Sequence, residues 1–185
     1  MVTIKGTVIL DSIRAVKERE GEQVYAEIIR LLDEDTRRVF QGGIFDTAWY
    51  PLDAFVRFLA VDLQETAGGN ERVLIARSEV VVEKQLRGLY RVFARLSSAE
   101  SVIRRLTGIH RTYFEGVTID FKTTGSTQAT VRYVGFEPQH RLMEYALIGL
   151  YRKALELSGA KQVSTGFTAS SGQGKGYWGL ALSWR

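Results

Sequence analysis

Four strand-like segments flank one helical segment in the last third of the chain. Apolar and polar residues alternate along these segments, which is typical of strands that bury one face. The strand-like segments are 113–124, 128–136, 162–170 and 176–184, and the helical segment between the two pairs is 139–157. Glycine-containing turns join the members of each pair, so neighbouring strands run antiparallel. The ββαββ order therefore predicts a four-stranded antiparallel sheet with the helix packed on one face.

The first 112 residues carry apolar positions at helical spacing instead. One helix ends at Gly21, and the next one closes at the connector Asp33-Glu34-Asp35. Pro51 suits the first turn of a third helix, a fourth follows Gly68-Gly69, and a serine of Ser97-Ser98-Ala99-Glu100-Ser101 caps a fifth. We expect an α/β (α+β) fold in one domain over 1–185, with 1–112 mainly helical and 113–185 bearing the sheet.

The glycine-rich segment Gly172–Gly176 resembles a phosphate-binding loop in composition but differs in context. Phosphate-binding loops lead into a helix whose backbone N–H groups face the phosphate. This segment leads into the strand-like run 176–184 instead. The sequence therefore predicts a hairpin turn at this place.

Charge is spread evenly along the chain. The 185 residues have a formal net charge of +4, with 45% hydrophobic and 25% charged residues, as in an ordinary soluble globule. Residues 1–112 hold 17 Lys and Arg against 16 Asp and Glu, and residues 113–185 hold 8 against 5. Because positive charge is not gathered into a stripe, we expect no nucleic-acid partner.

The chain has no cysteine, which excludes disulfides, Cys-ligated zinc and iron–sulfur clusters. No apolar run approaches the roughly 20 residues that span a bilayer. The first residues also lack the order of basic, apolar and small residues that marks a signal peptide. We expect a cytoplasmic protein without membrane insertion.

The helical segment 139–157 is apolar nearly all round. A sheet covers only one face of such a helix, so either the N-terminal helices or a second copy of the chain must cover the other. If a second copy does so, the sequence predicts a homodimer. The contact would then involve Met143, Leu147, Leu150 and Tyr151.

Several short motifs of the chain resemble a known family. They are Trp49-Tyr50-Pro51, Leu86-Arg87-Gly88-Leu89-Tyr90-Arg91, Leu96-Ser97-Ser98-Ala99-Glu100, Tyr113-Phe114-Glu115-Gly116 and the glycine-rich hairpin ending at Trp184. Over roughly residues 40–185 the chain resembles an uncharacterised bacterial family best represented in myxobacteria. More distantly it is similar to the superfamily of haem nitric-oxide-binding domains, 4-vinyl reductase-type domains and TRAPP subunits.

The chain departs from the best-known chemistries of that superfamily. Haem-binding members need an axial histidine and a tyrosine–serine–arginine group for the propionates, and we do not find that group here. The cysteines of the 4-vinyl reductase-type and acylated TRAPP members are absent. The resemblance therefore implies a scaffold with a pocket or an interface, and we expect no haem and no other cofactor.

Two histidines, His110 and His140, lie 30 residues apart without further ligands at a recognisable spacing, so we expect no metal site. His110 could ligate haem iron, but an imidazolium that suits the negative end of a helix is the simpler interpretation. Arg105, His110, Arg111 and Tyr113 form a cationic–aromatic group that could bind a small apolar or anionic ligand. Alternatively, the arginines lie on the solvated face of an amphipathic helix.

Catalytic motifs are missing. The chain has no Gly-x-Ser-x-Gly elbow, and its carboxylate pairs lie among lysines and arginines, as on solvated helix faces. We expect a non-enzymatic module that senses a small molecule or acts as a scaffold in a bacterial signalling or regulatory system. The alternatives are a protein-interaction subunit without a ligand and an enzyme of unrecognised class.

Overall fold

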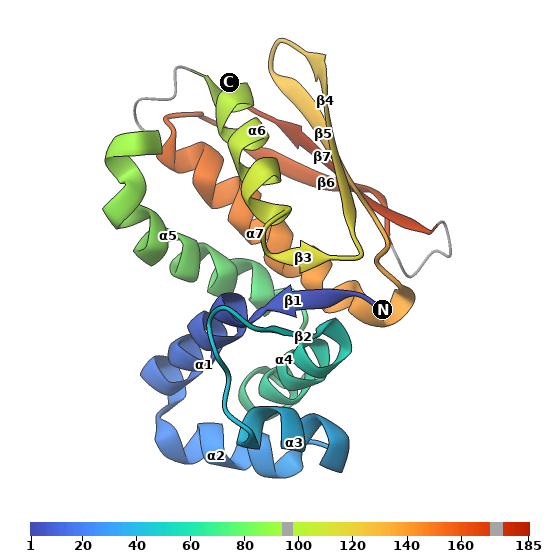
Figure 1. Ribbon diagram of the computed structural model, residues 1–185. Coiled ribbons are helices and arrows are strands. Elements are labelled where there is room, and N and C mark those ends of the chain that lie inside the picture. The colour runs from blue at the N-terminus through green and yellow to red at the C-terminus, as the bar shows by residue number, and fades with distance from the viewer. Residues whose placement is uncertain (94–97, 171–175) are drawn as a thin grey trace.

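The computed structural model describes residues 1–93, 98–170 and 176–185, and it has a mixed α/β fold with two antiparallel sheets (Figure 1). The helices are α1 Gly6–Glu20, α2 Glu22–Leu31, α3 Glu34–Gln41, α4 Leu52–Ala67, α5 Val73–Phe93, α6 Ala99–His110 and α7 Arg141–Leu157, preceded by the 3-10 turn η1 Pro138–His140. The strands are β1 Thr3–Lys5, β2 Trp49–Pro51, β3 Phe114–Glu115, β4 Thr118–Gly125, β5 Gln128–Val134, β6 Ser164–Ala169 and β7 Tyr177–Ser183.

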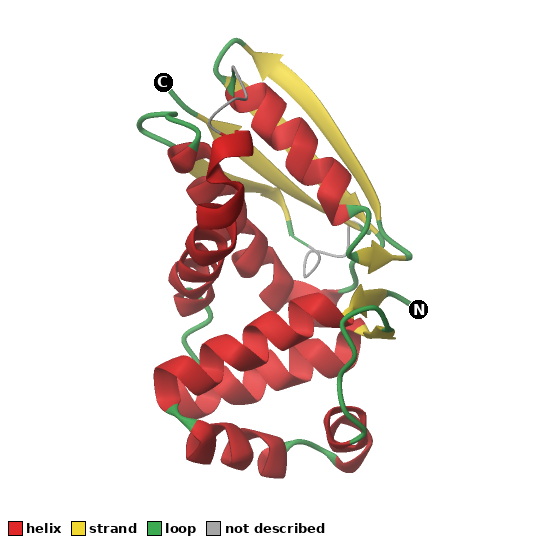
Figure 2. Ribbon diagram, turned by 60° about the vertical axis from the view of Figure 1, so that its left-hand side comes forward, coloured by secondary structure: helices red, strands yellow, loops and turns green. Residues whose placement is uncertain are grey.

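The larger sheet has the strand order β4-β5-β7-β6, and every neighbouring pair is antiparallel. It forms an outer layer of the molecule, and the helices lie on one side of it (Figure 2). Helix α7 follows β5 in the chain and connects the two hairpins, as the ββαββ pattern predicts. The predicted fold class is therefore confirmed.

The face of this sheet that is turned toward the helices contributes side chains to the hydrophobic core. Tyr133 in β5 is paired with Ile119 in β4 and with Trp178 in β7, and all three side chains are buried. Arg132, the next residue along β5, is exposed and stacks on Tyr177 with 4.1 Å between the guanidinium carbon and the ring centroid. Strand alternation thus separates a buried face from a solvated one.

Helix α5 covers the second face of α7. Ser78 Oγ in α5 donates a hydrogen bond of 2.6 Å to the carbonyl of Ala146 in α7. Gly149 lets the two helices approach so closely that a Cβ atom there would collide with the carbonyl oxygen of Ile75. The sequence left open whether an N-terminal helix or a second copy of the chain packs on this face of α7. In the structure the helix α5 packs there.

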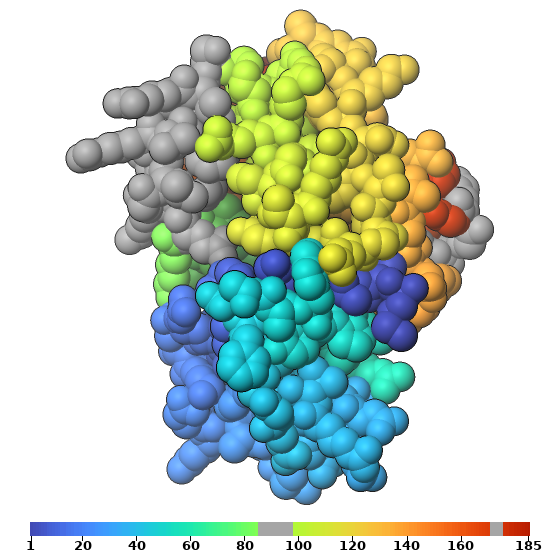
Figure 3. Space-filling view, viewed as in Figure 1, coloured from blue at the N-terminus to red at the C-terminus, as the bar shows by residue number. Residues whose placement is uncertain are grey.

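A three-stranded sheet in the order β2-β1-β3 joins the two parts of the chain, and the sequence analysis did not predict it. Strand β1 pairs with β2 from the N-terminal part and with β3 from the C-terminal part. Helices α1 to α4 form one half of the molecule, α5 and the elements after it form the other, and the two halves meet across the middle (Figure 1, Figure 3). Strands of two or three residues are too short to show a period of two.

The segment after Asp33 is a helix, and its prediction as a connector was wrong. Asp33 caps α3, because its carboxylate accepts hydrogen bonds from the Thr36 backbone N–H at 3.0 Å and the Thr36 hydroxyl at 2.8 Å. These two hydrogen bonds and that with Arg57 hold the pKa of Asp33 at about 2. The aspartate is therefore a cap and not the end of the preceding helix.

The hairpin turn expected at Gly172–Gly176 lies outside the described residues, apart from Gly176. Over the described ranges, no helix combines the length and the hydropathy needed to cross a membrane.

Candidate functional site

A pocket of about 150 Å³ lies where the N-terminal helices meet the sheet-bearing half. Helices α1 and α4 supply one side of it, and α5, α7 and the end of α6 supply the other. Most of its lining is apolar, including Val16, Leu59, Val81, Phe114, Met143 and Leu147. One face of α1 lines it from Thr7 to Arg19, a length of about 18 Å at the helical rise of 1.5 Å per residue.

One end of the pocket is occupied by His110, the last residue of α6. Its side chain is 2% exposed. His110 Nδ1 lies 2.5 Å from the hydroxyl of Tyr133 in β5 and 3.4 Å from the hydroxyl of Tyr151 in α7. The two tyrosine hydroxyls are 2.9 Å apart. A helix end, a strand and a second helix thus bring three hydrogen-bonding side chains into one buried group, which we call the His110 group.

The His110 group is uncharged at neutral pH. Burial lowers the pKa of His110 to about 4, raises the pKa of Tyr151 to about 12 and raises that of Tyr133 well above its usual value. The sequence analysis favoured an imidazolium stabilised by the helix end, and that interpretation was wrong. The desolvation cost of a buried charge exceeds what a helix dipole offers.

The second ring nitrogen of His110 is unsatisfied. Nε2 is buried and has no hydrogen-bond partner among the described residues. Buried polar groups in folded proteins almost always have a partner, and leaving one without a partner costs free energy. Because His110 also lines the pocket, a molecule at this end of the pocket could supply the missing hydrogen bond.

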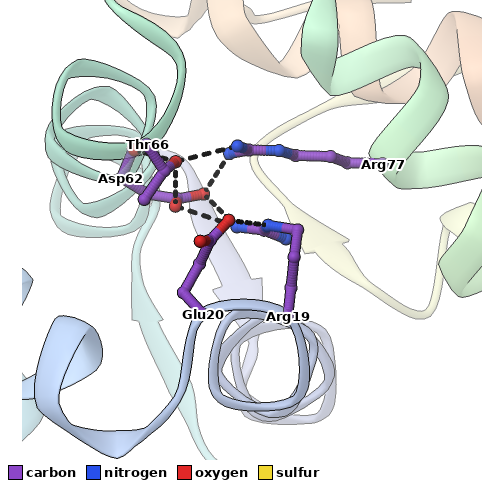
Figure 4. A network of polar contacts seen from close by, with 5 residues as sticks. All are labelled: Arg19, Glu20, Asp62, Thr66 and Arg77. Carbon is purple, nitrogen blue, oxygen red and sulfur yellow. Dashed lines mark hydrogen bonds and ion pairs between the residues drawn. The ribbon is translucent and has the colours of Figure 1, made fainter.

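The opposite end of the pocket is formed by a network of ion pairs around Asp62 (Figure 4). Asp62 in α4 is 2% exposed and pairs with Arg19 of α1 at 3.0 Å and with Arg77 of α5 at 2.8 Å. Thr66 joins the network by donating to Asp62 and accepting from Arg77, and Glu20 pairs with Arg19 at 2.7 Å. Two positive and two negative side chains are present, so the network carries no surplus charge.

The structure separates the four residues predicted to bind a ligand into two pairs. His110 and Tyr113 line the pocket. Arg105 and Arg111 are exposed, and Arg111 donates a hydrogen bond of 2.8 Å to the carbonyl of Ile119. The two arginines therefore lie on the solvated side, as in the alternative interpretation of this segment.

The residues predicted for a contact with a second copy face the interior of the chain. Met143, Leu147 and Leu150 line the pocket, and Tyr151 belongs to the His110 group. Met143 and Leu147 are 3% exposed, and Tyr151 is fully buried. A second copy would reach these side chains only if α5 moved away from α7.

Sequence reasoning missed Arg19, Asp62 and Arg77. One signal was available for Asp62, which lies between Leu59 and Leu63 on the apolar face of α4. A carboxylate at a core position of a helix is almost never buried unless it is paired. Its partners could not be read from the sequence, because they lie on other helices.

The second histidine has a structural role. His140 Nδ1 accepts a hydrogen bond of 3.0 Å from the backbone N–H of Glu137, and its Nε2 lies 2.9 Å from a carboxylate oxygen of Asp53. These contacts join the start of α7 to the start of α4. No group of three potential metal-ligating side chains occurs in the parts of the chain that the structure describes.

Comparison with solved structures finds similar folds among H-NOX proteins. A mutant of the Fe(II) unliganded H-NOX protein from K. algicida is 13% identical, with a TM-score of 0.73 over 98% of this chain and 97% of that chain. The H-NOX protein from S. oneidensis in the Fe(II)NO ligation state is 15% identical, with a TM-score of 0.71 over 98% and 99%. An oxygen-binding H-NOX domain related to soluble guanylate cyclases, in its oxygen complex, is 13% identical, with a TM-score of 0.67 over 98% and 95%.

No protein-family model and no curated protein sequence matches the chain. At identities of 13% to 15%, the structural likeness shows a shared fold. The wider part of the resemblance noted in the sequence, to nitric-oxide-binding domains, is therefore supported at the level of the fold. The myxobacterial and TRAPP parts of that resemblance stay predictions.

Proposed function

We propose that this chain is a non-enzymatic module that binds a small molecule in the pocket and transmits its presence to a partner in a bacterial signalling system. One observation carries the proposal: an apolar pocket lies between the two halves of the molecule and is lined by His110, whose buried Nε2 has no hydrogen-bond partner among the described residues. A pocket with few polar groups in apolar walls is typical of small-molecule sites. Because both halves line it, a bound molecule would contact both.

The H-NOX likeness supports a sensing function. The similar structures include an H-NOX protein in its Fe(II)NO ligation state and an oxygen-binding H-NOX domain in its oxygen complex. A fold by itself does not determine function, so the residues of this pocket decide what it can hold.

The residues of the pocket do not fit haem. His110 Nε2 is free to act as a ligand, but the pocket of about 150 Å³ is smaller than the ~300–1,000 Å³ that drug-sized molecules occupy, and haem is larger than those. The arginines that could pair with propionates, Arg19 and Arg77, are already paired with Asp62. We therefore propose a ligand other than haem.

Reconstitution with haemin tests this part of the proposal. The purified protein should give no sharp Soret band at stoichiometric haemin. A stoichiometric band that disappears in His110→Ala would show that haem does bind through this histidine, and the proposal of a haem-free pocket would be withdrawn.

Native mass spectrometry of the protein purified from its own host tests the proposed function. We expect a retained small molecule in the wild-type protein. Ala15→Phe should lose it, because residue 15 lines the pocket and the larger ring fills it. Ala60→Phe is the matched control, since Ala60 is exposed on α4 and does not line the pocket.

Two results would replace the proposal. A stoichiometric protein partner without any small molecule would favour a scaffold. Turnover of a substrate that is lost on changing one buried polar side chain, such as His110, would identify an enzyme.

Self-association is a further proposal for the intact chain. Helix α5 covers the face of α7 that suggested it, so a homodimer would use other surfaces. Sedimentation equilibrium at micromolar concentrations distinguishes a dimer from a constant mass near 20.8 kDa, which would rule the dimer out.

A further inference from the structure

We propose that the ligand of this pocket is a compact, neutral, apolar molecule with one hydroxyl group, of the size of a phenol, whose hydroxyl binds Nε2 of His110. This inference rests on the proposed function and adds the chemical class of the ligand. Three properties of the pocket support it: its volume, its balance of charge and the hydrogen-bonding state of His110.

The volume of the pocket suits a ligand of about one ring. An apolar protein cavity of about 150 Å³ holds a benzene molecule, and this pocket has a volume of about 150 Å³. The ring of Phe114 lies edge-on to His110 with 6.3 Å between the ring centroids, and Met143 and Leu147 are among the other side chains that line the pocket. These side chains favour an apolar body.

The charge balance favours a neutral ligand. Arg19 and Arg77 are the cations that line the pocket, and both donate to the carboxylate of Asp62. An anionic ligand would have to compete with this buried carboxylate, and separating a buried ion pair is strongly unfavourable. A cationic ligand would find Asp62 already shared by two guanidinium groups, and Asp11, the other carboxylate among the described lining residues, paired with Arg14 at 3.3 Å.

The polar group of the ligand follows from the two tautomers of His110. If Nδ1 donates to Tyr133, then Nε2 accepts a hydrogen bond; if Tyr133 donates to Nδ1, then Nε2 carries the proton and donates. A hydroxyl group can donate and accept, so it satisfies Nε2 in either case. A carbonyl accepts only, and an aliphatic amine would carry a charge, whereas the carboxylates that line the pocket, Asp11 and Asp62, are already paired with arginines.

Phenol and toluene are matched probes for isothermal titration calorimetry on the full chain. They share one ring and differ by a hydroxyl against a methyl group. We expect the wild-type protein to bind both. In His110→Phe we expect phenol affinity to fall about tenfold or more while toluene affinity stays within about threefold, because a buried hydroxyl without a partner is penalised.

A second measurement does not depend on the folding of that variant. Nitrogen-15 NMR of the wild-type imidazole should show a shift of the His110 Nε2 signal on adding phenol and little change on adding toluene. Ala15→Phe should abolish binding of both probes, and Ala60→Phe should leave both unchanged.

The outcomes separate this inference from the proposed function. Toluene binding with exclusion of phenol, or an unchanged Nε2 signal, would overturn the role of the hydroxyl and leave the pocket as a ligand site. If neither probe binds while the host protein still retains a small molecule that Ala15→Phe loses, the ligand class is wrong and the proposed function stands. If no molecule is retained either, both fail.

Discussion

His110 links the stability of the protein to pH. Its ordinary pKa of 6.5 falls to about 4 in the folded protein because the ring is buried. Between these values the unfolded chain binds a proton that the folded chain does not. The unfolding free energy that depends on the neutral His110 ring is therefore fully present above pH 6.5, and it is lost as the pH falls toward 4. A shift of this size corresponds to about 3 kcal/mol of unfolding free energy.

Chemical denaturation at a series of pH values from 7 to 4 measures this effect. The wild-type protein should lose about 3 kcal/mol more than His110→Phe over this interval. Carboxylates titrate in both proteins and cancel in the comparison. Parallel curves for the two proteins would contradict a buried neutral imidazole.

Asp62 is the second residue on which the pocket depends. Asp62→Asn keeps the shape of the side chain but removes the charge that balances Arg19 and Arg77. We expect a loss of about 3 kcal/mol in unfolding free energy, because removing one partner leaves buried charge unpaired. Asp33→Asn is the control. Asp33 pairs with Arg57 in a more exposed position, and asparagine caps a helix equally well, so Asp33→Asn should lose much less unfolding free energy than Asp62→Asn.

At the scale of elements, the contact between α5 and α7 depends on a glycine. Gly149→Ala would place a methyl group against the carbonyl oxygen of Ile75, so the two helices must separate. We expect a destabilisation of about 1–3 kcal/mol, as for other overpacked positions. Thermal or chemical unfolding measures it.

Gly108 offers the matched control in α6. Nothing lies within 4 Å of a Cβ atom at this position, and the backbone is helical. Gly108→Ala should stabilise the protein by about 0.5–1 kcal/mol through helix propensity alone. Equal effects at the two positions would contradict the close approach of α5 to α7.

The larger sheet could be predicted because its strands bury one side of an alternating pattern, and α7 because a long apolar segment separates the two strand pairs. In β5, Val131 and Tyr133 are buried on one face while Arg132 is exposed on the other. The short strands β1 and β2 could not be predicted in this way, and the predicted strand 113–124 divides into β3 in the smaller sheet and β4 in the larger one. Pairing between segments far apart in the chain creates the short strands, as between Ile4 and Phe114.

The site was predictable only in part, because its residues come from separate elements. His110 and Tyr113 stood out as neighbours in the sequence. The partners of His110 were hidden in an alternating strand and an apolar helix, where Tyr133 and Tyr151 look like ordinary core residues. A hydrogen bond between such distant residues leaves no pattern along the chain.

At the scale of the whole molecule, the pocket and the three-stranded sheet both join the two halves. Strand β1 pairs with β2 and β3, and the side chains of Arg19 and Arg77 meet on Asp62 across three helices. A ligand in the pocket would add contacts to the same boundary. Binding would therefore stabilise the arrangement of the halves more than the fold of either one, which is what a sensing module requires.

Because the two halves are joined in this way, we expect residues 1–185 to unfold as one cooperative domain. In Trp49→Phe the remaining tryptophans, Trp178 and Trp184, report on the sheet-bearing half, while far-ultraviolet circular dichroism reports mainly on the helices, most of which precede residue 94. We expect the two signals to give the same denaturant midpoint and slope, because neither half keeps its core when β1 and the Asp62 network separate. If helical signal were lost at a lower denaturant concentration than tryptophan fluorescence changes, the halves would be separate folding units. The pocket would then open without unfolding the sheet.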